Sequence, residues 1–359
     1  TAFMPGRGAP DSNMMRRVLK EDSEQTARMI PGFEFGSIHI DFQKCYDSIT
    51  ADFKQLAALA IDAPVMFQIV LAEISFGNKF VVETTEGRTE EAAHETGERQ
   101  GNVMSCTSCN IVSTLLAFTL QKRDILYQVQ ISEKMAGKDP KLFEAIDSDK
   151  MGSFYVDDSG IPCRGKEEMI QTTKILGHFS INSRIGINGP KSFFNHMAPV
   201  EKLMDSIEIC AWDRDNQTVQ MTGMERIRGE GFNKSLGIIV GEYAEVHQIQ
   251  DAHVSRKIDS ALSRVASKRG LTKIEMETFM SAVGNASVLY DVLSSNCSLY
   301  IIRRAMKRQI AIISRAFGIR WCDRKAVLFA PVRLGGNAQR YLMCEIVCNL
   351  VRELIYFLN

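Results

Sequence analysis

Two adjacent carboxylates interrupt a stretch of the sequence that otherwise has the composition of a β-strand. The run is "GSFYVDDSGI", residues 152–161, in which aromatic and β-branched residues precede Asp157 and Asp158. Asp, Ser and Gly are common turn residues, so the run predicts a hairpin whose tip carries both acids. Such a tip is either an ordinary polar turn or a pair of ligands for a hard cation, and the run alone leaves both interpretations open.

A third acid, Asp41, ends an alternating run far upstream. In "GSIHIDF", residues 36–42, successive side chains would point to opposite faces, which is typical of a half-buried strand. A site for two divalent metals needs a carboxylate from a second segment, and an acid at the end of a strand that faces an acidic hairpin tip supplies it. The alternative is that Asp41 only caps the next segment.

The order of the expected elements indicates the α+β class. After a helix from Asp11 to about Ala27 come the strand at 36–42, helices near 51–62 and 64–75, a hairpin near 79–94 that turns at Glu86-Gly87, a helix near 103–130, the acidic hairpin, a helix near 166–180, and short strands within 185–240. Strand, helix, hairpin, helix and strand in this order predict a ferredoxin-like, split βαβ unit. Beyond about residue 245 the sequence is almost wholly helical, so a domain boundary is expected there.

Composition limits the setting in which the chain works. With 359 residues, 45% of them hydrophobic, the chain can form two or three packed units. Its nine cysteines lack a framework spacing, which favours a reducing, intracellular compartment. Cys106 and Cys109 have no second pair at zinc-site spacing, so we interpret them as packed thiols. Because no apolar run reaches the length of a membrane span, we expect a soluble protein with no membrane partner.

Five segments occur in the order and approximate spacing of the palm motifs of reverse transcriptases. They are "HIDFQKCYDSI", "GERQGNVMSCTSCNI", "FYVDD", "IGINGPKS" and "SLGIIV", and they most resemble those of the non-LTR retrotransposon class, to which group II intron reverse transcriptases are related. "AFMPGRGAPDSNM" resembles the fingers segment that precedes the first palm motif, and "APVRLGGNAQR" is similar to the late Gly-Gly segment of that class. The resemblance covers most of residues 1–240 and is looser beyond them.

The resemblance implies a right-hand polymerase fold. Residues 1–35 would be partial fingers, 36–245 a ferredoxin-like palm with interleaved fingers elements, and 246–359 a helical thumb with a C-terminal segment. The implied activity is that of an RNA-directed DNA polymerase of a non-LTR retroelement, which extends a DNA primer with dNTPs on an RNA template. Its place of action would be the nucleus or the cytoplasm.

The same resemblance implies a two-metal site. Asp41 and Asp157 would bind both ions, the Phe42 carbonyl would complete one coordination shell, and Asp158 would support the site. Hard oxygen ligands and phosphates select Mg²⁺, for which Mn²⁺ is a possible substitute. Two bound ions are a recurring arrangement of polymerases.

Further residues would contact nucleotide or template. Tyr46, five residues after Asp41, corresponds to an aromatic ring that collides with a ribose 2′-hydroxyl, although a core role is the alternative. Gly101 would let the backbone approach the substrate, Gln100 offers a donor and an acceptor, and Arg99 can meet phosphate. Tyr155 of the acidic hairpin belongs to the same group.

Lys191, in "INGPKS", matches the family's lysine near the leaving pyrophosphate. There it could neutralise charge or donate a proton. The alternative is a solvated surface lysine after a Gly-Pro turn.

The helical C-terminal part of the sequence carries a strong positive charge, although the chain as a whole is neutral. From Ser255 to Lys325 there are fourteen Lys or Arg and five Asp or Glu, so the rest of the chain carries an equal negative excess. Like charges spaced i,i+4 on a helix are unfavourable unless something neutralises them, and phosphates would do so. We therefore expect contacts with a template-primer duplex, with a solvated basic face as the alternative. The expected contact residues are Arg256, Lys257, Arg303, Arg304, Lys307 and Arg308.

Some features depart from the family. Glu90, Glu91 and Glu95 make the hairpin before Gln100 acidic, so that arm is expected to face solvent. Cys106 stands where the class usually has Pro, and Val156 where it usually has Ala. The basic fingers segment that clamps the triphosphate in the family is absent from this sequence. We therefore expect residues 1–359 alone to be weakly active or inactive.

Two other functions fit parts of the sequence. One is an RNA-dependent RNA polymerase on the same palm, and the other is a catalytically idle, maturase-like module that binds RNA. Retention of three acids disfavours the idle module, since unpaired buried charge is costly.

Tyr46 separates the two polymerase activities. We expect Tyr46→Ala to incorporate ribonucleotides that the wild-type chain rejects, because the ring no longer meets the 2′-hydroxyl. The measurement is single-nucleotide addition with matched rNTP and dNTP. Equal ribonucleotide use by both proteins would contradict the gate.

Overall fold

The computed structural model describes most of the central part of the chain. The described residues are 13, 16, 19–20, 23–24, 26, 30–76, 79–93, 97, 103–123, 127–128, 150–151, 153–155, 158–227, 233–235, 238–240, 246–268, 270–295, 297–318, 346–348 and 351. The chain divides into two units, unit 1 (Thr1–Arg228) and unit 2 (Gly229–Asn359). Each unit is described by itself.

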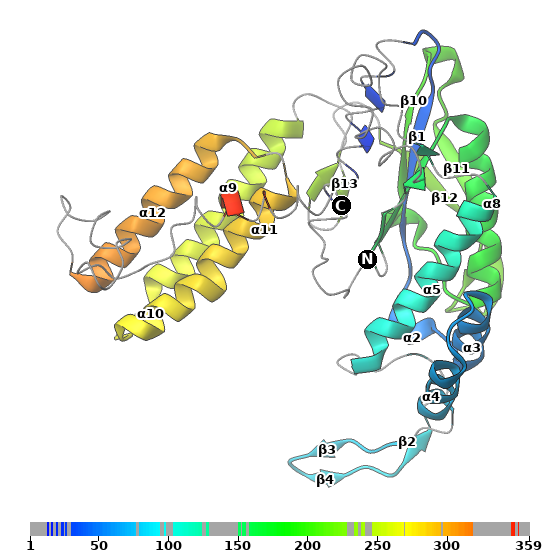
Figure 1. The fold of residues 1–359 in the computed structure, drawn as a ribbon, viewed down its shortest axis with the longest axis horizontal. Helices are drawn as coiled ribbons and strands as arrows, with labels where there is room; N and C mark the ends of the chain where they lie inside the picture. Colours follow the sequence, from blue (N-terminus) through cyan, green and yellow to red (C-terminus); the bar gives the residue numbers. More distant parts are fainter. Residues whose placement is uncertain are drawn as a thin grey trace. The chain divides into compact units, whose positions relative to one another are not determined.

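A mixed, six-stranded sheet organises unit 1 (Figure 1). Its strand order is β11-β12-β10-β1-β9-β8. The central strand β1 pairs antiparallel with both β9 and β10, while β10 and β12 are parallel. The strands are β1 (Phe35–Asp41), β8 (Ser153–Tyr155), β9 (Asp158–Cys163), β10 (Phe193–Met197), β11 (Ser206–Asp213) and β12 (Thr218–Arg226).

Helices alternate with these strands as the sequence predicts. The order β1, α5, β8, β9, α8, β10 together with the strand order β10-β1-β9-β8 is that of a split βαβ unit. The α+β class is therefore confirmed. The helices of unit 1 are α2 (Cys45–Ser48), α3 (Ala51–Ala60), α4 (Val65–Ser75), α5 (Val103–Lys122) and α8 (Lys166–Ser183), with 3₁₀ turns η1 (Gly189–Lys191) and η2 (Val200–Lys202).

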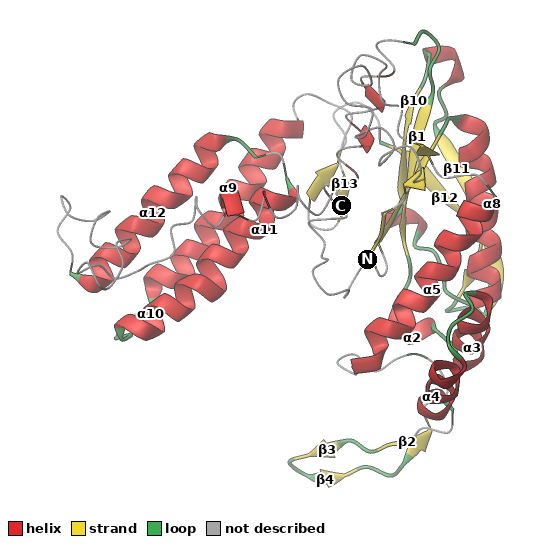
Figure 2. Cartoon of the chain, viewed as in Figure 1, coloured by secondary structure: helices red, strands yellow, loops and turns green. Residues whose placement is uncertain are grey.

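Helices α3, α5 and α8 enclose the main core of unit 1 against one face of the sheet (Figure 2). Ile38, Ile40, Ile161 and Phe194 from the three central strands are almost completely buried in this core. Gly177 allows the close approach of α8, because a Cβ there would lie 2.5 Å from the Cys210 carbonyl oxygen of β11. Burial of these apolar side chains is the main stabilising contribution to the sheet.

The opposite face of the sheet is covered in part by helical residues near the N-terminus. All described residues from Asn13 to Thr26 are helical, in agreement with the predicted first helix. Leu19 packs there with Phe35, and Phe33 and Met197 lie against the pair.

Two short pairings form the hairpin that follows α4. Strand β2 (Lys79–Phe80) pairs with β5 (Ala92–Ala93), and β3 (Glu83–Thr84) pairs with β4 (Gly87–Arg88). The turn lies at residues 85–86, one residue earlier than predicted. Glu90 and Glu91 are exposed, as expected, and Glu91 pairs with Lys79 at 3.1 Å. Glu95 lies outside the described residues.

The helix predicted over 103–130 is too long. It ends at Lys122, and β6 (Tyr127–Gln128) then pairs with β7 (Lys150–Met151). The β-branched and aromatic residues near 127 suit this pairing better than the last turns of a helix.

Unit 2 begins with a hairpin and continues as helices. The segment "FNKSLGIIV" forms β13 (Asn233–Ser235) and β14 (Ile238–Val240), which belong to this unit. The helices are α9 (Val246–Ser267), α10 (Lys273–Phe279), the π-helix η3 (Met280–Asn285), α11 (Ala286–Ser294) and α12 (Leu299–Phe317). They share a core of their own that includes Val254, Leu262, Ile302 and Ile313. The division into fingers, palm and thumb stays a prediction.

Phe194 tests the core of unit 1. We expect Phe194→Ala to lower the free energy of unfolding by about 3–5 kcal/mol, because it leaves a cavity behind the central strand. The measurement is urea unfolding followed by circular dichroism. The control is Val200→Ala, at a side chain 83% exposed, with an expected change within about 0.5 kcal/mol. A change below about 1 kcal/mol for Phe194→Ala would contradict this core.

Candidate active site at the ends of strands β1 and β9

The last residues of β1 and the first of β9 bring two of the predicted acids together. In the antiparallel register Asp41 lies directly opposite Asp158, while Gly160 lies opposite His39. Opposed Cα atoms in such a pair are about 4.5–5.5 Å apart. Asp41 is half-buried, and of Asp158 the structure describes the backbone. Asp157 lies outside the described residues.

Strand β1 ends at Asp41 because a second segment takes over its backbone hydrogen bonds. The Asp41 N–H donates to Ser192 Oγ at 3.1 Å, and the Asp41 carbonyl accepts from the Asn188 N–H at 2.9 Å. Phe42, whose side chain is buried, then forms an isolated bridge with Ile187. The segment "INGPKS" thus fixes the backbone on both sides of the Asp41 side chain.

Lys191 lies within this same segment. It is exposed and ends the 3₁₀ turn η1, directly before Ser192. The structure therefore brings Lys191 to the end of β1 that carries Asp41, as the predicted pyrophosphate contact requires. The role of the lysine in the reaction stays a prediction.

Ser192 and Asn188 are residues that the sequence analysis missed. Both belong to the quoted segment "INGPKS", from which we singled out only the lysine. The nearby signal in the sequence was the glycine at position 189. The structure shows why a glycine stands there, because a Cβ on Gly189 would lie 2.8 Å from the Gly223 carbonyl oxygen of β12. A glycine that is required for close approach indicates a backbone with a fixed position.

Tyr46 lies one short turn beyond the site, in α2. Lys44 has φ +44°, a left-handed conformation that turns the chain from β1 into this helix. The Tyr46 ring is half-buried and packs against the main core of unit 1. Burial raises the pKa of the Tyr46 phenol, and the nearby thiols Cys109 and Cys106 raise it further. The phenol is therefore neutral at physiological pH. The partial burial is compatible with both the gate and the core role.

Arg99, Gln100 and Gly101 lie outside the described residues, but their neighbours are anchored beside α2. The Gly97 N–H donates to the Ile49 carbonyl at 3.0 Å. Gly97 has φ +87°, and a Cβ there would lie 2.7 Å from the Asp47 Cα, so glycine is required. After the three residues, α5 begins at Val103 and contacts α2. Tyr155, also predicted to contact nucleotide or template, lies opposite Asp158 in β8.

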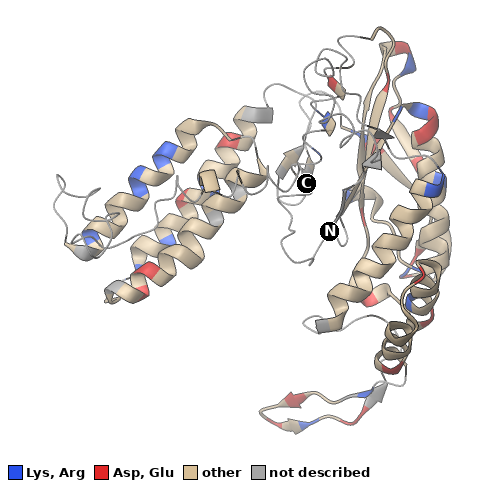
Figure 3. Cartoon of the chain, viewed as in Figure 1, with Lys and Arg blue, Asp and Glu red and all other residues tan. Residues whose placement is uncertain are grey.

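In unit 2 the predicted duplex contacts fall on two helices. Arg303, Arg304 and Lys307 are exposed on α12, along which Figure 3 shows several cationic residues. Arg256 is exposed on α9, where its Nε donates to the Ala252 carbonyl at 3.3 Å. Lys257 Nζ lies 5.9 Å from the centroid of the Tyr290 ring.

Two of the α12 cations, Arg304 and Arg308, have an acidic partner within unit 2, so their charge is neutralised in part without a phosphate. Asp259 on α9 accepts from Arg304 Nη2 at 2.8 Å and also pairs with Arg308. Arg308 Nη2 further donates to Ser263 Oγ at 2.6 Å. The i,i+4 spacing in the sequence reveals like charges on one helix, but it cannot reveal that an acid on the neighbouring helix pairs with them. Arg303 and Lys307 remain the stronger candidates for a phosphate contact.

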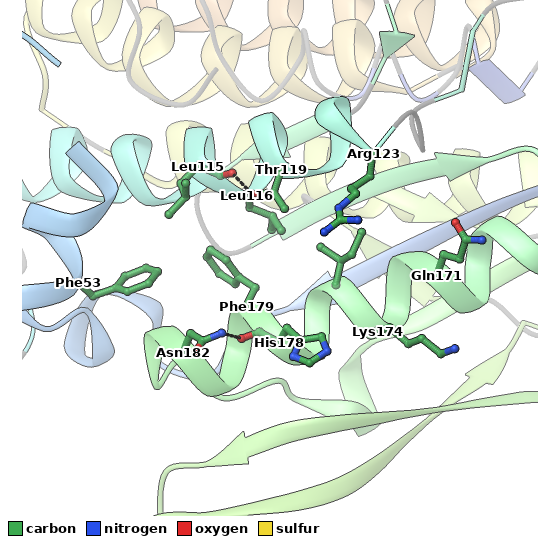
Figure 4. A pocket seen from close by; sticks show the side chains of 11 residues that line it. Phe53, Leu115, Leu116, Thr119, Arg123, Gln171, Lys174, His178, Phe179 and Asn182 are labelled. Carbon is green, nitrogen blue, oxygen red and sulfur yellow. Dashed lines mark hydrogen bonds between the residues drawn. The ribbon is translucent and has the colours of Figure 1, made fainter. Parts of the chain in front are cut away.

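A pocket of about 700 Å³ lies elsewhere in unit 1, among α3, α5 and α8 (Figure 4). Apolar side chains form much of its lining, and Arg123 and Lys174 also line it. None of the predicted site residues borders this pocket. It therefore belongs to the helical side of the sheet rather than to the strand ends.

Two features are absent from the described part of the chain. Among the described side chains, no group of three or more His, Cys, Asp or Glu residues is placed to hold a metal ion. None of the described helices combines the length and apolar character needed to cross a membrane.

Comparison with known proteins gives weak structural similarity. No protein-family model matches the chain, and no curated protein matches it significantly. Among solved structures, telomerase from Candida tropicalis in complex with a TWJ fragment of telomeric RNA is 10% identical, with a TM-score of 0.33, covering 86% of this chain and 50% of that one. Apo telomerase from the same organism is 11% identical, with a TM-score of 0.36 and coverage of 87% and 55%.

Telomerase from Candida albicans with a TWJ fragment of telomeric RNA is 10% identical, with a TM-score of 0.35 and coverage of 89% and 58%. The chain thus spans little more than half the length of the structures that it matches. A similarity this low assigns neither a family nor an activity.

Ser192 tests how the end of β1 is held. We expect Ser192→Ala to lower the free energy of unfolding by about 1–3 kcal/mol, because the Asp41 N–H loses its acceptor. Ser192→Thr retains a hydroxyl and should lose less. The measurement is urea unfolding, with Ser206→Ala at an exposed position of β11 as the control. Equal stabilities of Ser192→Ala and the control would contradict the role of this hydrogen bond.

Proposed function

We propose that the chain is the RNA-directed DNA polymerase domain of a non-LTR retroelement, which extends a primer 3′-hydroxyl with dNTPs. The observation that carries this proposal is the register of β1 and β9, which sets Asp41 opposite Asp158. The order of five sequence motifs along the chain supports it. Asp41, Asp158 and Lys191 come from three separate segments, and a catalytically idle binding fold has no need to gather them at one strand end.

The donor set at the strand ends fits hard divalent cations. Carboxylate and carbonyl oxygens are the ligands that Mg²⁺ prefers. In enzymes that act on phosphates, the ion is commonly bound by one or two protein carboxylates together with oxygens of the substrate phosphates. Asp41 and Asp157 would hold two Mg²⁺ ions, the Phe42 carbonyl would add a ligand, Asp158 would support them, and Mn²⁺ could substitute. Bound there, the ions would activate the primer hydroxyl and stabilise the charge on the leaving pyrophosphate.

The protein's own residues supply position and charge. The hydrogen bonds from Asn188 and to Ser192 fix the Asp41 backbone before substrate arrives, which is the preorganisation that electrostatic catalysis requires. Lys191, exposed on the same segment, would contact the pyrophosphate and offset its charge.

Selection of the sugar would fall to Tyr46. Its ring is half-buried against the core of unit 1, and the helix that carries it, α2, contacts α5. A fixed aromatic ring excludes a 2′-hydroxyl while it tolerates deoxyribose. The neutral phenol adds no repulsion toward the triphosphate.

The nucleic acid partners would be an RNA template and a DNA primer. In unit 2, the exposed Arg303 and Lys307 of α12 would contact duplex phosphates, and each neutralised phosphate releases counterions. Binding should therefore weaken steeply with salt. The same two residues would serve an idle, maturase-like RNA-binding module equally well, so binding of nucleic acid alone does not establish polymerase activity.

Single-nucleotide addition at enzyme excess tests the proposal, because it detects rates too slow for long extension. We expect the chain to add a matched dNTP to a primer on RNA with Mg²⁺ or Mn²⁺. Asp41→Asn and Asp157→Asn should slow addition by about 1,000-fold or more while duplex binding, measured by fluorescence anisotropy, is unchanged.

The matched control is Asp215→Asn, at an exposed turn between β11 and β12, which should add nucleotide at the wild-type rate. Equal rates for Asp157→Asn and the wild type would contradict the proposal. Tight duplex binding with no addition in either metal, both by this chain and by a chain that also carries a basic fingers segment, would favour the idle RNA-binding module.

A further inference from the structure

An arginine from the N-terminal helical region occupies the place of a missing side chain on β9. A Cβ built on Gly160 would lie 2.8 Å from Arg16 Nε and 3.2 Å from Arg16 Cζ. Gly160 is buried and Arg16 is half-buried. The guanidinium therefore rests directly on the strand backbone, in the space that any larger residue at position 160 would fill.

Gly160 is close to the acidic end of the strand. It lies two residues after Asp158, or about 6.8 Å along the strand, and side-chain positions two apart lie on the same face of a sheet. Gly160 is opposite His39 in β1 and opposite Ser153 in β8. Arg16 thus lies on β9, the strand between β1 and β8, two residues from the position where Asp158 is opposite Asp41.

This part of the sheet needs support on both faces. Strand β8 is at the edge of the sheet and pairs only with β9 among the described strands. On the helical side, Ile161 is fully buried in the main core. On the other side, a glycine offers no side chain to pack, and glycine inside a strand weakens it. Contact with Arg16 replaces the packing that Gly160 cannot provide.

We propose that Arg16 is a positioning residue of the active site, whose guanidinium clamps β9 at Gly160 and so holds Asp158 in register with Asp41. The catalytic consequence rests on the proposed polymerase function, whereas the contact itself does not. Lysine would be a poor replacement, because its compact ammonium lacks the flat, rigid guanidinium that covers a strand backbone. The proposal also gives a reason for glycine at position 160.

A double-mutant cycle tests the clamp independently of activity. Arg16→Ala and Gly160→Ala should each speed amide hydrogen exchange in peptides that cover residues 153–163, the first by removing the guanidinium and the second by displacing it. In the Arg16→Ala background, Gly160→Ala should cause little further change, because the added methyl group enters vacated space. Lys20→Ala, on the next helical turn, is the control and should leave these peptides protected.

Kinetics test the catalytic consequence. We expect Arg16→Ala to lower the rate of single-nucleotide addition by about 10- to 100-fold with little change in the KM for dNTP, because the acids rather than the nucleotide contacts are displaced. Arg16→Lys should be intermediate.

Additive effects of Arg16→Ala and Gly160→Ala on exchange would overturn the clamp. Faster exchange throughout unit 1 would also overturn it, since that result indicates only general destabilisation. If neither the wild-type chain nor a chain that also carries a basic fingers segment adds nucleotide, the polymerase function fails, but the exchange cycle still decides whether Arg16 holds β9.

Discussion

The antiparallel pairing of β1 with β9 is the interaction on which the rest of unit 1 depends. Its register is enforced by the core, because Ile38, Ile40 and Ile161 are all buried on the helical side of the sheet. A slip of one residue would turn these side chains toward the other face and expose them. The same register sets Asp41 opposite Asp158. Hydrophobic burial thus determines where the acids meet, although no acid takes part in it.

Hydrogen bonds hold the end of β1 at Asp41, beyond the last residues that pair with β10. The pairing of β1 with β10 ends at His39 and Phe193, whose rings stack with centroids 4.5 Å apart. Beyond that point, Ser192 and Asn188 bind the Asp41 backbone. The strand end is therefore held by β9 on one side and by the segment before β10 on the other. Such a rigid backbone suits a site that must gather several negative charges before its counterions bind.

Much of this arrangement could be predicted from the sequence, because alternation, element order and motif spacing are local properties. The strand that ends at Asp41, the helices that follow it and the split βαβ order all agree with the prediction. Contacts between distant segments could not be predicted in this way. The pairing of Arg304 and Arg308 with Asp259 joins two helices, and the packing of Arg16 on Gly160 joins a helical region to a strand. Ser192 was overlooked because a serine after a lysine carries no pattern of its own.

The central claim is that Asp41 and the acidic hairpin share divalent cations at one end of the sheet. Anomalous diffraction from crystals of the chain soaked in Mn²⁺ tests it most directly, since the signal locates the ions without reference to activity. The account predicts manganese peaks within coordination distance, about 2.0–2.3 Å, of carboxylate oxygens of both Asp41 and Asp157. Well-ordered carboxylates of these two residues that point apart, with manganese bound elsewhere or not at all, would contradict it.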